Sequence, residues 1–245
     1  MSLRCRFLGL FGIPLCVATA TLLFAGGAFG LVKVPTSQWG GFFLTLVVST
    51  SVLAVSLPVG ILLALGRLSQ IPLVRALCGA WVEFWRAMPA IVLLFVVIIM
   101  LPLFTPPGVE VDKLLRALIA LVLLMSAYLA EVMRGAFQAI PTGQREAAAA
   151  LALGYRATLG SVILPQALAI AAPQIASQFI GLFKETTLLV VVGFFDLPGM
   201  VQTAATDPAW LSASSMATGY LFTALLFWTC CFSMSRFAAR LESRR

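Results

Sequence analysis

Long apolar segments alternate with short polar stretches along the whole chain. Six of these segments have the length of a membrane-crossing helix, which needs about 20 residues to cross a hydrocarbon core about 30 Å thick. The fifth is over-long and polar in its middle. We expect it either to be broken, near residues 178–187, or to face a lumen in part, because irregular backbone at membrane depth is tolerated where it lines a cavity. The predicted spans are 8–31, 40–65, 81–104, 114–133, 165–195 and 219–237.

A helix-forming insert between the fourth and fifth spans is too polar to cross a membrane. From Glu146 to about Leu159 it is rich in Ala, Leu, Glu and Arg, which favour the helix. Leu151, Tyr155 and Leu159 recur at i, i+4 and i+8 and form one apolar stripe, which Glu146 and Arg156 flank. A short amphipathic helix at the edge of a membrane is typical of a docking element.

The composition indicates an all-α integral membrane protein. Hydrophobic residues make up 61% of the 245 residues and charged residues 10%, whereas soluble domains carry about 25% charged residues. About six spans with short loops fill this length, which predicts one membrane domain. Arg4 and Arg6 lead into an apolar stretch longer than a signal-peptide core, so we expect the first span to be an uncleaved helix rather than a signal peptide.

The distribution of Lys and Arg predicts the orientation, because cytoplasmic loops carry an excess of these residues. With an inner N-terminus and six spans, eleven of them fall on the inner side, and Lys33, Lys113 and Arg116 fall on the outer side. Both termini and the polar insert are then cytoplasmic. The net charge of +7 follows from this topology and from contact with anionic membrane lipid, and it requires no nucleic-acid partner.

The chemistry available to the chain is restricted. The sequence has no histidine, and its five cysteines lie in or beside spans without the spacing of a metal site. It also lacks a Gly-rich loop ending in Lys-Ser or Lys-Thr, so an ATPase would be a separate chain. We therefore expect that the chain is not an enzyme and that it has no metal and no cofactor of its own.

The polar insert and its surroundings resemble one family. Residues 146–156 are similar to the cytoplasmic EAA loop of importer-type ABC transporter permeases, and residues 127–135 and 184–188 are similar to the polar amino-acid branch of these permeases. Further pieces, such as residues 34–41, resemble the general L-amino-acid permeases. The resemblance covers roughly residues 40–240 and keeps the order and spacing of many motifs.

The resemblance implies a type I ABC importer permease fold with a cytoplasmic EAA coupling helix at about 142–160. It implies an extra helix and outer linker at 1–38, a five-helix core at 39–240 and a basic tail at 241–245. The implied function is that of the transmembrane permease subunit of an ATP-driven importer of L-amino acids in the bacterial inner membrane. Such a subunit forms half of the translocation path and receives the ATPase stroke through the EAA loop.

The implied partners are those of an ABC importer. A dimer of ATP-binding subunits would hold ATP and Mg, and a periplasmic amino-acid-binding protein would deliver the substrate. The general L-amino-acid branch has two different permeases, so the second permease subunit is expected to be a paralogue of this chain.

Two positions depart from the EAA pattern of the family. Where the family has Gly six residues after the EAA glutamate, this chain has Ala152, and Gly154 follows two residues later. The usually aromatic position thirteen residues after the glutamate is Leu159. Because Gly costs about 1 kcal/mol against Ala inside a helix, we expect a more continuous coupling helix here.

The resemblance assigns contact with the ATPase to the polar insert. Glu146 would meet a basic or hydrogen-bonding group there, although a carboxylate at a helix N-terminus also interacts with the helix dipole. Thr142 could cap the helix, and the small side chains of Ala147 and Ala148 would let another backbone approach. The predicted coupling residues are Gly143, Glu146, Ala147, Ala148, Leu151, Gly154 and Tyr155.

Ionisable residues in or near spans are candidates for the substrate path, because such groups are costly in a membrane and often functional. A zwitterionic amino acid needs a cation for its carboxylate and an acceptor for its ammonium group. Ion pairing is the structural alternative: Glu131 with Arg134 and Glu83 with Arg86 are each spaced i, i+3, and an interhelical pair is equally open for the residues of the fifth span. The four candidates are Arg86, Glu131, Lys184 and Glu185.

A second class of function stays open. The chain could be an ion-gradient-driven secondary amino-acid transporter, although its spans show no inverted repeat with paired broken helices and few carboxylates for a proton relay. A membrane enzyme is less favoured, because the sequence shows no catalytic constellation. Dependence on ATP, or co-purification with an ATPase, distinguishes the two transporter classes.

Overall fold

A computed structural model describes residues 34–106, 108, 111–210, 212 and 214–242. The predicted first span lies outside these residues. The described part of the chain is helical and contains no strand, as the sequence predicts. Within it, four helical segments are long and apolar enough to cross a membrane, and a fifth crossing results if one bent pair counts as a single span. The four segments are Gly41–Arg67, Lys113–Gln138, Tyr155–Val192 and Ser215–Arg240.

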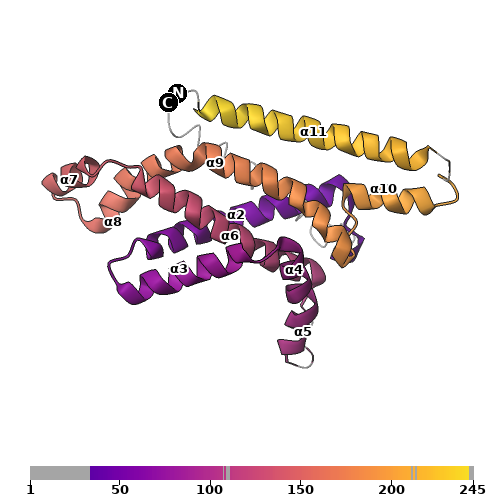
Figure 1. Cartoon of the computed structure of the whole chain (residues 1–245), viewed down its shortest axis with the longest axis horizontal. Helices are drawn as coiled ribbons and strands as arrows, with labels where there is room; N and C mark the ends of the chain where they lie inside the picture. Colours follow the sequence, from indigo (N-terminus) through magenta and orange to yellow (C-terminus); the bar gives the residue numbers. More distant parts are fainter. Residues whose placement is uncertain (1–33, 107, 109–110, 211, 213, 243–245) are drawn as a thin grey trace.

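The long helices run side by side along the longest axis of the molecule (Figure 1). They are α2 (Gly41–Arg67), α6 (Lys113–Gln138), α9 (Leu164–Glu185) and α11 (Ser215–Glu242). The short helices α7 and α8 lie at one end of this bundle and α10 at the other (Figure 1). The remaining α-helices are α3 (Pro72–Ala87), α4 (Ala90–Phe95), α5 (Leu101–Phe104), α7 (Gly143–Ala150), α8 (Tyr155–Ala157) and α10 (Leu197–Thr206). Short 3₁₀ or π-helical elements are η1 (Thr36–Gln38), η2 (Val96–Met100), η3 (Thr158–Ile163) and η4 (Thr186–Val192).

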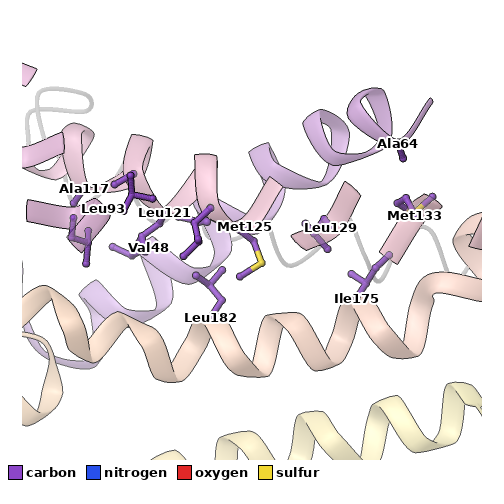
Figure 2. Close-up of a cluster of buried hydrophobic side chains, with 14 of the residues drawn as sticks. Val48, Ala64, Leu93, Ala117, Leu121, Met125, Leu129, Met133, Ile175 and Leu182 are labelled. Carbon is purple, nitrogen blue, oxygen red and sulfur yellow. The ribbon is translucent and has the colours of Figure 1, made fainter. Parts of the chain in front are cut away.

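The centre of the core lies where α2 packs against α6. A Cβ atom on Gly60 of α2 would lie 2.9 Å from the Cβ of Leu129 and 3.1 Å from the carbonyl oxygen of Ser126. Glycine therefore lets the two backbones approach closely at this crossing. Figure 2 shows Leu182 of α9 pointing toward Met125 of α6, so α9 closes the same apolar cluster from a third side.

The predicted third span, 81–104, is wrong as a continuous helix. α3 ends at Ala87, and the helical segment that starts at Ala90 is bent away from it by 101°. Met88 has an extended backbone, with ψ 134°, which is the conformation that a residue before proline prefers. The sequence signal for the bend is Pro89, which directly follows Met88.

The bent segment contains a π-helical stretch, Val96–Met100, between α4 and α5. A guanidinium nitrogen of Arg116 donates a hydrogen bond of 2.5 Å to the carbonyl oxygen of Ile98 within this stretch. A backbone acceptor whose regular helical bonding is disturbed thereby gains a charged donor from α6. This bond fixes the bent segment to the first turn of α6.

The predicted break in the fifth span is also wrong over most of its range. α9 is helical without interruption from Leu164 to Glu185 and includes Pro173. Only at Thr186 does the chain change to a 3₁₀ helix, which runs to Val192 and ends at Gly193 with φ +80°. The polar side chains that suggested a cavity lie on a regular helix.

Candidate functional site: a coupling tip and an arginine cluster

The polar insert forms two short helices, α7 and α8, which extend from one end of the bundle (Figure 1). Glu146 lies in the first turn of α7 and its side chain is exposed. The prediction that the Thr142 side chain caps this helix is wrong. Instead, the Thr142 carbonyl oxygen accepts hydrogen bonds from the amides of Arg145 and Glu146, at 2.9 and 3.2 Å.

The end of α7 is a Schellman motif. The amide of Leu153 donates to the carbonyl oxygen of Ala148 at 3.1 Å, and the amide of Ala152 donates to that of Ala149 at 2.9 Å. Ala152 has φ +54°, a left-handed conformation that normally favours glycine. The predicted continuous coupling helix is therefore wrong, because this chain makes the turn with alanine.

The break in the insert changes which side chains share a surface. The predicted stripe of Leu151, Tyr155 and Leu159 does not lie on one helix, because α7 ends at Ala150 and Leu159 packs against the core. Leu151 and Tyr155 are 75% and 77% exposed. An exposed carboxylate and two exposed apolar side chains thus occupy the tip of the insert.

The two alanines after Glu146 differ in their surroundings. Ala147 is exposed, and Ala148 is buried within the chain itself. The small size of Ala148 is therefore explained by its own packing, whereas that of Ala147 leaves room for something outside the chain. Gly143 and Gly154 flank this surface, at the start of α7 and just before α8. The Gln166 side-chain amide of α9 donates to that of Gln144 at 3.1 Å and fixes the orientation of α7.

A second group of polar residues lies toward the C-terminal ends of α2, α3 and α6. Glu131 accepts hydrogen bonds from Arg134 on its own helix, which confirms the predicted pair. It also pairs with Arg67 of α2 at 2.7 Å and lies 3.8 Å from Arg86 of α3. The predicted pair of Arg86 with Glu83 is wrong, because Glu83 approaches Arg67 instead, at 3.6 Å.

Arg67 has no predicted role beyond its place on the inner side in the Lys and Arg bias. Its partner Glu131 is 64 residues away, so no local spacing reveals the contact. Arg86 is the least engaged arginine around this carboxylate, and its guanidinium also lies over the ring of Tyr128, 5.7 Å from the centroid.

The other two candidates for the substrate path lie farther along the bundle. Lys184 and Glu185 end α9; the Lys184 side chain is exposed and that of Glu185 is half-buried. Among the described residues, no ion pair joins either of them to Arg86 or Glu131. Within the same residues, no group of three or more Cys, Asp or Glu side chains could hold a metal ion.

Comparison with known proteins identifies the family to which this helical architecture belongs. Residues 56–245 match the family described as "binding-protein-dependent transport system inner membrane component". The chain belongs to this family. It is 52% identical over 222 residues to the inner membrane amino-acid ABC transporter permease protein YhdY of Escherichia coli, covering 91% of this chain and 60% of that protein. It therefore spans less than two thirds of that relative's length.

Other relatives carry amino-acid transport in their names. A glutamate/glutamine/aspartate/asparagine transport system permease protein of Rhodobacter capsulatus, BztC, is 43% identical over 244 residues, which cover 95% of this chain and 56% of that protein. A probable glutamine ABC transporter permease protein of Bacillus subtilis, GlnP, is 32% identical over 207 residues, which cover 84% of this chain and 93% of that protein.

Two solved structures share the fold. A crystal structure of an amino acid ABC transporter with histidines aligns with TM-score 0.71 and 25% identity, covering 84% of this chain and 92% of that one. An inward-facing structure of the MetNI methionine ABC transporter aligns with TM-score 0.60 and 25% identity, covering 81% and 91%. The fold of this family member is thus that of an ABC importer permease.

Proposed function

We propose that this chain is the transmembrane permease subunit of an ATP-driven importer of amino acids. The observation that carries this proposal is the combination of family membership with an exposed tip at α7 and α8. An all-helical subunit with this tip has a surface through which an ATP-hydrolysing partner can act. The names of its relatives support amino acids as the substrate class. The chain itself makes or breaks no bond.

The tip supplies the contacts with the ATPase in this proposal. Glu146 meets a basic or hydrogen-bonding group, and the exposed Leu151 and Tyr155 enter an apolar groove of the partner, supported by their 75% and 77% exposure. Exposed Ala147 permits close approach, and Gly143 and Gly154 bound the surface. The partner holds ATP and Mg. Movement of the tip is transmitted to α6 and α9, the long helices that flank the insert.

The inner part of the substrate path includes Arg86 and Glu131 in this proposal. Arg86 is the cation best able to take a substrate carboxylate, because it lies 3.8 Å from Glu131, whereas Arg67 and Arg134 hold that residue through hydrogen bonds. Glu185 remains a candidate for a more distant point of the path, whereas the exposed Lys184 beside it at the end of α9 is not assigned to the path. A second permease subunit, a paralogue, supplies the other half, and a periplasmic amino-acid-binding protein delivers the substrate.

The chain lies in the bacterial inner membrane with the tip in the cytoplasm, where ATP is. The bias of Lys and Arg toward that side supports this orientation. An ion-gradient-driven transporter is the alternative function. It predicts uptake that collapses with a protonophore and persists without ATP, whereas the proposed importer has the opposite requirements.

The decisive experiment reverses the charge of Glu146. Glu146→Lys is expected to abolish ATP-dependent uptake in membrane vesicles and to reduce co-purification of the ATPase, while membrane insertion is unchanged, because the side chain is exposed and stabilises little of the fold. Asp207→Lys is the matched control, an equal charge reversal at an exposed site beyond α10, and it should retain the ATPase. Wild-type uptake by Glu146→Lys would remove the coupling assignment.

A further inference from the structure

A cleft of about 520 Å³ opens between the inner ends of α2, α3 and α6, outside the coupling tip. It lies at the end of the bundle that carries α7, because α6 ends only a few residues before α7 begins. Its lining combines basic groups with small side chains. The residues are Arg67, Leu68, Arg75, Ala76, Gly79, Ala80, Glu83, Arg134 and Gln138.

The cleft carries an excess of positive charge. Arg67 and Arg134 are already paired with Glu131, and Glu83 lies 3.6 Å from Arg67. Arg75, in contrast, forms no ion pair with any described residue, although it lines the cleft and is exposed. An open basic site with an unneutralised guanidinium is suited to an anion, and guanidinium groups bind phosphate through paired hydrogen bonds.

The wall that α3 contributes leaves space for a bulky group. Ala76, Gly79 and Ala80 are small, and a Cβ atom added at Gly79 would meet nothing within 4 Å. Side chains at these positions do not fill the cleft, so a headgroup with several atoms around its phosphorus can enter.

An exposed apolar surface of α3 begins beside the cleft. Leu73, Leu77, Trp81 and Phe84 recur at helical spacing, and their exposed fractions are 68%, 62%, 43% and 53%. At 100° per residue the stripe adjoins Ala76 and Ala80 of the cleft wall, whereas Arg75 and Gly79 lie on the far side of that wall. The stripe extends along α3 from the inner end of the bundle toward its middle. A basic cleft and an apolar stripe on one helix match a ligand that has a negative head and hydrocarbon chains.

We propose that this cleft binds the phosphodiester of an anionic glycerophospholipid, whose acyl chains lie along the Leu73–Phe84 stripe. A soluble anion would use the arginines and make no contact with the stripe, whereas a zwitterionic lipid would bring a cation of its own into a cleft that already carries an excess of positive charge. Basic pockets between membrane helices at the cytoplasmic side are suited to acidic headgroups. The proposal rests on the proposed function only for assigning this end of the bundle to the inner leaflet.

The test is native mass spectrometry of the full-length chain in detergent, titrated with phosphatidylglycerol or with phosphatidylcholine. We expect the wild type to retain phosphatidylglycerol preferentially. Arg75→Gln should lower this retention about tenfold, because it removes a charge-assisted contact. Gly79→Leu should lower it as much by filling the cleft while keeping every charge. Neither change should affect the retention of phosphatidylcholine.

Two matched control variants and one competing anion distinguish a specific lipid site from a general effect of substitution and from a site for soluble anions. Arg156→Gln removes an exposed arginine in α8, and Gly181→Leu adds a side chain in α9 where a Cβ also meets nothing within 4 Å; both should bind phosphatidylglycerol like the wild type. Unchanged binding by Arg75→Gln and Gly79→Leu overturns the proposal. So does displacement of the lipid by millimolar inorganic phosphate, which would identify a soluble-anion site. Binding in detergent does not depend on uptake, so failure here leaves the transport function untouched.

Discussion

Ala152 shows how a single residue can preserve a turn that its side chain disfavours. The left-handed conformation costs an L-residue about 1–2 kcal/mol relative to glycine, yet two backbone hydrogen bonds of 3.1 and 2.9 Å close α7 around it. Helix propensity alone favours Ala over Gly at this position and predicts a more continuous helix, which is wrong. The propensity of one residue is smaller than the combined effect of the hydrogen bonds and the packing of Leu159 into the core.

Ala152→Gly is expected to stabilise the end of α7 by about 1 kcal/mol, because glycine adopts this conformation without the steric penalty. Hydrogen exchange of the Leu153 amide should slow about fivefold. Ala149→Gly, at an exposed helical position in the same element, is the control and should speed the exchange through the lower helix propensity of glycine. If exchange in Ala152→Gly is unchanged or faster, residue 152 does not form the turn in solution.

Asp196 is a buried carboxyl group at the end of the bundle opposite the coupling tip. It caps α10, where its Oδ1 accepts a hydrogen bond of 3.2 Å from the Gly199 amide, while Oδ2 is buried and has no partner among the described residues. Burial raises the pKa of Asp196 from 3.8 to about 6, against the lowering effect of the backbone hydrogen bonds. The folded state therefore favours the neutral carboxyl.

This raised pKa predicts a loss of stability between about pH 4 and pH 6. The stabilising contribution of the neutral form is complete below the unfolded value of 3.8 and is lost as pH rises through about 6. The full effect is on the order of 3 kcal/mol. Asp196→Asn keeps a capping oxygen and cannot ionise, so its thermal midpoint in detergent should exceed that of the wild type at pH 7.5. Equal midpoints at pH 7.5 would show that the carboxylate is solvated.

At the scale of elements, one carboxylate joins three helices. Glu131 of α6 binds Arg67 of α2 and Arg134 of α6 and lies near Arg86 of α3, with its side chain 29% exposed. Glu83 has a single contact of 3.6 Å and a side chain that is 73% exposed. Glu131 therefore links three helices, whereas Glu83 makes one weak contact with a single neighbouring helix.

Glu131→Gln is expected to lower the free energy of unfolding by about 2 kcal/mol, because charge-assisted hydrogen bonds are lost and three arginines remain together. Glu83→Gln should change it by less than about 1 kcal/mol, as is typical of exposed pairs. The measurement is the thermal or denaturant midpoint of the full chain in detergent. Equal effects of the two substitutions would contradict a central role for Glu131.

Elements with an uninterrupted apolar sequence were predictable, and those shaped by distant contacts were not. The spans that became α2 and α6 follow from hydropathy, and the pair of Glu131 with Arg134 follows from helical spacing. The bend after α3 has a local signal, Pro89, which outweighs the hydropathy on both sides. The contact of Arg67 with Glu131 depends on how α2 lies against α6, and no local pattern carries that information.

At the scale of the whole molecule, α9 extends from beside the coupling tip toward the opposite end of the bundle (Figure 1). Lys184 lies twenty residues beyond Leu164 on an uninterrupted helix, about 30 Å along its axis, which is about the thickness of the hydrocarbon core. A helix broken before Lys184 would have kept it deeper, facing a cavity. The continuous helix instead places an exposed lysine at the far end of the span from the coupling tip, where a long side chain can reach the membrane interface.

We therefore expect Lys184→Ala to leave amino-acid uptake in vesicles within about twofold of the wild type and to keep the ATPase bound, because an interfacial lysine contributes little to the path. Arg86→Gln, in contrast, should lose most uptake while still retaining the ATPase, since it removes the proposed cation for the substrate carboxylate without altering the tip. Each variant removes one positive charge, so a difference in uptake between them reflects where the charge lies and not the loss of charge itself. Loss of uptake by Lys184→Ala with the complex intact would place the outer end of α9 in the path, and the proposed path would then extend from Arg86 to Lys184.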